Sequence, residues 1–140
     1  MRDRFFLDTN VFVYEVDARE SAKRQRASEL IDTAVSSKRG VVSYQVVQEF
    51  FNVALKRFAK PFSAGEAEDY LSLTFKPILA VQSSPRLFGE ALQIQAHHHF
   101  SWYDALIVAA AQQAECSILY SEDMQHGRRI GNLKIENPFR

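Results

Sequence analysis

The sequence predicts an α/β fold, with a mainly parallel sheet flanked by helices, in one domain over residues 1–140. Three observations support this prediction. Short apolar segments alternate with longer helical patterns along the whole chain, with no repeat or linker between them. The first segment, Phe5-Phe6-Leu7, is continuously apolar, which is typical of a strand covered on both faces. A chain of 140 residues, 46% of them hydrophobic, is also large enough to bury an ordinary core.

The limits of each element follow from periodicity and from residues that start or stop it. Apolar continuity or alternation predicts strands over 5–7, 41–43, 77–81, 118–120 and 133–136, the last of them exposed or at a sheet edge. Apolar residues at helical spacing predict a helical turn over 11–14 and helices over 20–36, 44–58, 63–75, 84–99 and 101–115. Ser63 and Glu66 form a capping box, and Pro85 takes a first helical position. Pro61 should end the helix that begins at residue 44.

Composition and charge exclude several classes of protein. Seventeen basic residues balance seventeen acidic ones, which argues against a broadly basic nucleic-acid surface but is compatible with a local patch. Cys116 is the single cysteine and lies in an apolar context, so we expect a buried thiol and no disulfide or cysteine-based metal site. The sequence has neither a signal-peptide pattern nor an apolar run of about 20 residues. We therefore expect a cytoplasmic protein that does not contact a membrane.

Four acidic residues are candidates for a functional site: Asp8, Glu49, Asp104 and Asp123. Asp8 and Asp123 each follow a predicted strand and Asp104 opens a predicted helix, so these three should lie at one edge of the sheet. Each acid also has a structural explanation. Asp8 can cap a helix or form an Asx-turn, and Asp104 can form a capping pair with Ser101. Glu49 lies inside an apolar helix and, taken alone, is better explained as a solvent-facing side chain.

Taken together, the four carboxylates indicate a metal site. Four negative charges held close together repel one another, and a divalent cation removes that repulsion. Oxygen ligands without cysteine or histidine favour Mg²⁺ or Mn²⁺ over zinc. Asn10, two residues after Asp8, can orient a ligand or a water, while Glu122 competes with Asp123 for the last position. The run His97-His98-His99 points in three directions on a helix and is expected to be a solvated helix end.

Four motifs in the sequence resemble those of a known family. They are Leu-Asp-Thr-Asn at 7–10, Ser-x5-Glu-Phe at 43–50, Trp-Tyr-Asp-Ala-Leu-Ile-x-Ala-Ala-Ala at 102–111 and Leu-Tyr-Ser-Glu-Asp-Met at 119–124. In this order and spacing they resemble the PIN domain, and most closely the VapC toxin ribonucleases of bacterial type II toxin–antitoxin modules. The resemblance extends from Phe5 to Phe139. It implies a three-layer α/β/α sandwich with a central, mainly parallel sheet.

The resemblance also implies a site and an activity. It makes the metal-binding, catalytic quartet Asp8, Glu49, Asp104 and Asp123, with Asn10, Ser43 and Ser121 as accessory residues. The implied activity is Mg²⁺- or Mn²⁺-dependent endoribonuclease cleavage of RNA by a homodimer, which a small antitoxin protein neutralises. Basic residues near the motifs are candidates for contact with the substrate phosphate: Lys56, Arg57, Arg128 and Arg129. Trp102 and Tyr103 can stack on an unpaired base, but two aromatic residues at a helix start are more often part of the core.

Two other functions are left open by the sequence. A PIN-like fold can serve as a catalytically silent binding module, but such a module should have lost acids, and all four are present here. A phosphatase of the haloacid-dehalogenase type also uses an aspartate after its first strand. That chemistry requires Asp-x-Asp, with the second acid protonating the leaving group, and Asn10 cannot donate a proton in this way.

Overall fold

A computed structural model describes residues 3–17, 19 and 21–140 of the chain. The described residues form one six-stranded sheet with the order β3-β2-β1-β4-β6-β5. The strands are β1 (Phe5–Leu7), β2 (Gly40–Ser43), β3 (Leu79–Val81), β4 (Ile118–Tyr120), β5 (Arg129–Ile130) and β6 (Leu133–Glu136). Neighbouring strands are parallel except β5 and β6, which are antiparallel. The predicted mainly parallel sheet is therefore confirmed.

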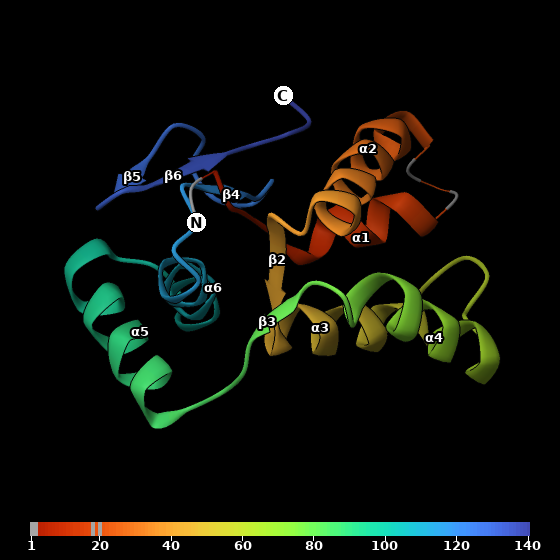
Figure 1. Ribbon diagram of the computed structural model, residues 1–140, viewed down its shortest axis with the longest axis horizontal. Helices are drawn as coiled ribbons and strands as arrows, with labels where there is room; N and C mark the ends of the chain where they lie inside the picture. The colour runs from red at the N-terminus through yellow and green to blue at the C-terminus, as the bar shows by residue number, and fades with distance from the viewer. Residues whose placement is uncertain (1–2, 18, 20) are drawn as a thin grey trace.

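Helices cover both faces of this sheet. They are α1 (Thr9–Val16), α2 (Ser21–Ser37), α3 (Tyr44–Ala54), α4 (Ala64–Tyr70), the π-helical turn η2 (Leu71–Phe75), α5 (Pro85–His98) and α6 (Trp102–Gln113). Figure 1 shows α1 packed with α2 on one side of the strands, and α5 packed with α6 on the other. This arrangement is the three-layer α/β/α sandwich predicted from the sequence. No helix in the described ranges is long and apolar enough to cross a membrane.

Most helix starts agree with the signals in the sequence. The Ser63 capping box is complete, because the hydroxyl accepts from the Glu66 amide and the Glu66 carboxylate accepts from the Ser63 amide. Ser84 caps α5, with proline at the first helical position. The first helix begins at Thr9, two residues earlier than predicted. The start predicted for the next helix, Glu20, lies outside the described residues, and α2 begins at Ser21.

Two predictions about sheet and helix limits were wrong. The strand at 133–136 is not at an edge, because β5 pairs with its outer side. The sequence did not predict β5, because a strand of two residues is too short to show an alternating pattern. The helix predicted over 44–58 ends at Ala54. Phe58 lies eight residues after Phe50, so a continued helix would hold the two about 12 Å apart. The chain instead folds back, and their ring centroids are 5.9 Å apart.

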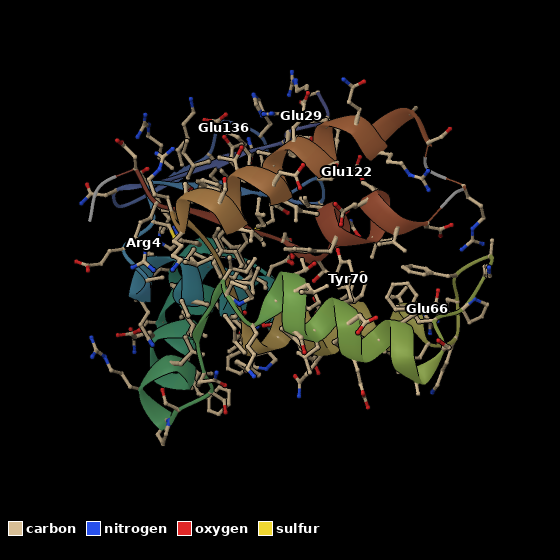
Figure 2. All side chains as sticks on the ribbon, turned by 45° about the vertical axis from the view of Figure 1, so that its right-hand side comes forward. Arg4, Glu29, Glu66, Tyr70, Glu122 and Glu136 are labelled. Atoms are coloured by element: carbon tan, nitrogen blue, oxygen red, sulfur yellow. The ribbon has the colours of Figure 1, made fainter. Side chains whose placement is uncertain are left out.

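The early end of α3 allows an aromatic cluster to form between α3, the chain that follows it, α4 and η2. The Phe50 ring is fully buried and packs against five others, those of Phe51, Phe58, Phe62, Tyr70 and Phe75. The wider π-helical turn at the end of α4 brings Phe75 onto Phe12, with centroids 4.8 Å apart. Tyr70 lies between α4 and α1 (Figure 2), where its hydroxyl donates to Glu15 at 2.8 Å. This cluster anchors α1 and α3, two of the three helices that border the cavity described next.

Candidate active site

A cavity of about 240 Å³ opens at the edge where β1, β2 and β4 end. Eleven residues line it: Asp8, Thr9, Asn10, Val13, Gln45, Glu49, Val53, Tyr103, Asp104, Ile107 and Asp123. All four acids proposed from the sequence are among them, together with Asn10. Within the described part of the chain, no lysine or arginine lines this cavity. The cavity is therefore a strongly acidic site without an internal counter-charge.

Asp8 both caps a helix and faces the cavity. It follows β1 directly, and its Oδ1 accepts from the Thr9 amide at 2.7 Å at the start of α1. Its Oδ2 accepts from the hydroxyl of Ser121, a fully buried residue at the end of β4, at 2.8 Å. Burial raises the pKa of Asp8 to about 6, and the negative charges of Glu49 and Asp104 add to that rise, against the two donors. A carboxylate is thus kept at a position where its charge is unfavourable.

Glu49 is held by neutral donors on two sides. The Thr9 hydroxyl donates to Oε1 at 2.6 Å, and Nε2 of Gln45 donates to Oε2 at 3.1 Å. Glu49 consequently faces the cavity, and the solvent-facing explanation for it was wrong. Sequence reasoning did not assign a role to Thr9 or to Gln45. Gln45 precedes Glu49 by one helical turn, and this spacing was the only sequence signal for the contact.

Asp104 and Asp123 complete the acidic lining. Asp104 lies in the first turn of α6, where its amide donates to the capping Ser101 hydroxyl at 3.2 Å. Partial burial, with Asp123 and Glu49 nearby, raises the pKa of Asp104 despite its contact with Ser101. Asp123 is exposed at the mouth, and the Asn10 amide donates to its Oδ2 at 3.0 Å. Asn10 therefore orients one of the proposed acids.

The competing acid Glu122 turns away from this cavity. It accepts a hydrogen bond from the Tyr14 hydroxyl and forms an ion pair with Lys23, beside α1 and α2 (Figure 2). Tyr14 lies one turn after Asn10 on α1, so the same helix holds Glu122 and its neighbour Asp123. The side chains of the two adjacent acids thus have separate partners, and only Asp123 lines the cavity.

Other candidate residues lie outside the cavity lining. Ser43 is fully buried, and its hydroxyl has no hydrogen-bond partner among the described residues. Arg128 donates to the carbonyl oxygen of His98 and stacks 4.3 Å from the Phe100 ring centroid. The basic candidates Lys56, Arg57 and Arg129 are exposed and do not line the cavity. The candidate basic residues are thus not preorganised around the acids.

Aromatic and histidine residues near the motifs have distinct surroundings. Trp102 is half-buried and packs against the edge of the core, with its ring centroid 6.4 Å from that of the exposed Phe88. Tyr103 is 65% exposed at the cavity, so the expectation that it belongs to the core was wrong. The His97 side chain is exposed at the end of α5, as predicted. Cys116 is buried, which raises the pKa of its thiol to about 12.

The acids suit a hydrated hard cation better than a closely ligated one. In the described ranges, no three His, Cys, Asp or Glu side chains are close enough together to hold one metal ion jointly. The lining nevertheless offers only oxygen ligands, and the pKa values of Asp8 and Asp104 are raised partly by their negative neighbours. Mg²⁺ usually keeps several of its waters and binds one or two carboxylates directly. The oxygen-rich lining of the cavity fits that mode of binding.

Comparisons with known proteins agree with this architecture. Comparison with curated proteins by sequence finds no significant match. A toxin–antitoxin complex from Klebsiella pneumoniae superposes with a TM-score of 0.67 and 15% identity, over 95% of this chain and 96% of that one. VapC20 from Mycobacterium tuberculosis, described as a sarcin-ricin loop cleaving toxin, gives 0.59 and 19%, over 85% and 89%.

A third similar structure is VapBC2 from Rickettsia felis bound to a DNA fragment from its promoter. It superposes with a TM-score of 0.63 and 19% identity, over 95% of this chain and 97% of that one. At these identities the similarities establish the fold. The family model of the PIN domain matches residues 5–130, which include all four motifs. The chain belongs to the PIN domain family.

Proposed function

We propose that the chain is a divalent-metal-dependent endoribonuclease, acting in the cytoplasm as the toxin of a type II toxin–antitoxin pair. One observation carries the proposal. Asp8, Glu49, Asp104 and Asp123 come from four separate segments of a PIN domain and line one cavity. Stability of the fold does not explain this arrangement, because repulsion between the carboxylates and their partial burial lower the free energy of unfolding. A catalytic role for the quartet explains that cost.

The proposed cofactor is Mg²⁺ or Mn²⁺, held by members of the quartet. When bound, such a cation supplies positive charge for the scissile phosphate and lowers the pKa of a nearby water. The chain's own residues orient the acids. Ser121 and the Thr9 amide hold Asp8, while the Thr9 hydroxyl holds Glu49. These contacts keep carboxylate oxygens at fixed positions around the substrate phosphate.

The proposed reaction is hydrolysis of the phosphodiester bond. A water oxygen attacks phosphorus, the bond from phosphorus to the 3′-oxygen breaks, and that oxygen leaves with a proton. The products then carry a 5′-phosphate and a 3′-hydroxyl. Since the 2′-hydroxyl takes no part in the reaction, RNA with a blocked 2′-hydroxyl at the cleavage site should also be cut.

The test is cleavage of a mixed cellular RNA pool with Mg²⁺ or Mn²⁺, with EDTA, and with the Asp8→Asn variant. We expect the native chain to cut only with metal, and Asp8→Asn to be slower by about 100-fold or more, the usual scale for losing an electrostatic catalytic group. Products with a 2′,3′-cyclic phosphate would contradict the reaction. Metal binding without cleavage would favour a silent binding module. Phosphomonoester hydrolysis through an aspartyl-phosphate would favour the phosphatase.

Protein partners belong to the same proposal: a small antitoxin and a second copy of the chain. One of the similar structures is described as a toxin–antitoxin complex, and another as VapBC2 bound to a DNA fragment from its promoter. The helix α5 exposes the apolar side chains of Phe88 and Leu92, which a protein partner can cover. Sedimentation equilibrium of the purified chain tests the homodimer.

Tyr103 is expected to contribute to binding of unpaired RNA. Its exposed ring lies at the cavity, and stacking of a base on an aromatic ring is worth about 1–3 kcal/mol. Tyr103→Ala should therefore raise KM for single-stranded RNA by roughly 5- to 150-fold with little change in kcat. Tyr103→Phe keeps the ring and should behave like the native chain. Leu73→Ala, at an exposed residue outside the cavity, is the control. An unchanged KM in Tyr103→Ala would contradict stacking.

A further inference from the structure

Gln45 is a buried polar residue that joins two of the acid-bearing helices. It is the second residue of α3 and only 4% exposed. Its Nε2 donates to Oε2 of Glu49 at 3.1 Å and to the backbone carbonyl oxygen of Tyr103 at 3.2 Å. Both partners are acceptors, so the amide nitrogen, and not the oxygen, must face them. Gln45 therefore connects Glu49 on α3 with the first turn of α6, which carries Asp104.

The other end of the same amide is unfavourable for folding. Oε1 of Gln45 is buried and has no hydrogen-bond partner among the described residues. A buried carbonyl oxygen without a donor lowers stability, whereas an apolar side chain of the same length would bring no such loss. Gln45 thus leaves one buried oxygen unpaired, while its nitrogen makes two hydrogen bonds to residues that line the acidic cavity. Stability of the fold does not explain this choice of residue.

Glu49 is the side chain that benefits from the arrangement. The Thr9 hydroxyl and Gln45 each hold one of its two oxygens, so the carboxylate cannot rotate freely. Both donors are neutral, so they orient the carboxylate without adding a positive charge beside it. Each carboxylate oxygen has a further lone pair, so both can still accept from a ligand. Glu49 is held in one orientation, and both of its carboxylate oxygens can still bind a ligand.

We propose that Gln45 is a positioning residue of the ribonuclease site, which fixes the orientation of Glu49 and its separation from the first turn of α6. The inference rests on the proposed function. Residues that orient metal-binding groups typically change metal affinity by about 10- to 100-fold when they are lost. Gln45 acts through Glu49 and does not need to touch the substrate.

The decisive variant is Gln45→Met, which keeps the length of the side chain but removes both the donor and the unpaired acceptor. We expect the metal-free variant to unfold within a few degrees of the native chain, because the loss of two hydrogen bonds is offset by removal of the buried unpaired oxygen. Its dissociation constant for Mn²⁺ should rise about 10- to 100-fold. Thermal unfolding in EDTA and calorimetric titration with Mn²⁺ measure the two quantities. Gln48→Met, at an exposed position on the same helix, should change neither.

A second comparison tests whether the effect passes through Glu49. Adding Gln45→Met to Glu49→Gln should weaken Mn²⁺ binding much less than adding it to the native chain, because coupled residues are not additive. Native-like Mn²⁺ affinity in Gln45→Met would overturn the inference, and so would equal effects in the two backgrounds. An unfolding temperature lowered by much more than a few degrees in Gln45→Met would show a structural role instead. If the native chain itself binds no Mn²⁺ and cuts no RNA, the proposed function fails, and the role of Gln45 fails with it.

Discussion

Asp8→Asn is expected to unfold at a higher temperature than the native chain when both are free of metal, although the substitution removes a proposed catalytic group. Burial raises the pKa of Asp8 from 3.8 to about 6, so its negative charge destabilises the folded chain at neutral pH. Asparagine keeps the shape, can accept from the Thr9 amide and can donate to the Ser121 hydroxyl. The gain at pH 7 should be on the order of 1–3 kcal/mol.

The sign of this effect depends on pH. The pKa of Asp8 is higher in the folded chain than in the unfolded one, so the penalty for its charge is complete above pH 6 and absent below about pH 4. The advantage of Asp8→Asn should therefore be full at pH 7 and shrink as the pH falls from 6 to 4. Thermal unfolding in EDTA across this range measures it.

Asp17→Asn is a matched control for the charge of Asp8. The ion pair with Arg19, at 2.7 Å, lowers the pKa of Asp17, so its charge is favourable in the folded chain. Asp17→Asn should therefore lower the unfolding temperature of the chain. If Asp8→Asn is also less stable than the native chain at pH 7, Asp8 serves mainly as a helix cap and its charge carries no penalty.

Metal should narrow or reverse the difference in stability between the native chain and Asp8→Asn. A ligand that binds only the folded state at 100 times its dissociation constant adds about 2.7 kcal/mol to stability. The native chain should gain this amount with saturating Mg²⁺ or Mn²⁺, whereas Asp8→Asn has lost one of the charges that would hold the ion. A rise in unfolding temperature that is equal in both proteins would assign metal binding to another part of the chain.

The acids that follow strands were the easiest to place from the sequence. Asp8 comes directly after a continuously apolar strand, and strand ends in parallel sheets meet at one edge, so its location followed from local sequence and one general rule. The same reasoning brought Asp123 to that edge. Capping and cavity lining were treated as competing explanations for Asp8, but they coexist, because its two oxygens have different partners.

Contacts between distant segments could not be predicted in this way. Glu49 faces the cavity because Thr9, forty residues away in sequence, donates to it. The partner of Gln45 on α6 is 58 residues away, and neither side of that contact has a local pattern that would indicate it. The end of α3 likewise depends on where the Phe50 ring finds its neighbours. Local periodicity predicts elements, but it does not contain the tertiary packing that sets their limits.

Gly40→Ala is expected to destabilise the chain by about 1–3 kcal/mol or more, because the added methyl group has no space. Gly40 begins β2 opposite Phe5, and its Cβ would lie 2.3 Å from the Ala34 Cβ and 2.6 Å from a Phe5 ring carbon. Gly89→Ala is the matched control. Gly89 lies inside α5 with open space around it, so alanine should stabilise the chain by about 0.5–1 kcal/mol. Urea unfolding measures both changes.

The origin of the Gly40 effect can be separated from general damage to the strand. Adding Ala34→Gly removes the closest atom, but the Ala34 Cα would still lie 2.7 Å from the new methyl group. The double variant should therefore recover part of the loss, less the usual penalty of about 1 kcal/mol for glycine inside a helix. No recovery beyond that penalty would mean that Phe5 or β2 itself, and not the packing of β2 against α2, limits the residue at position 40. Partial recovery would show that α2 lies against the sheet so closely that only glycine fits between them.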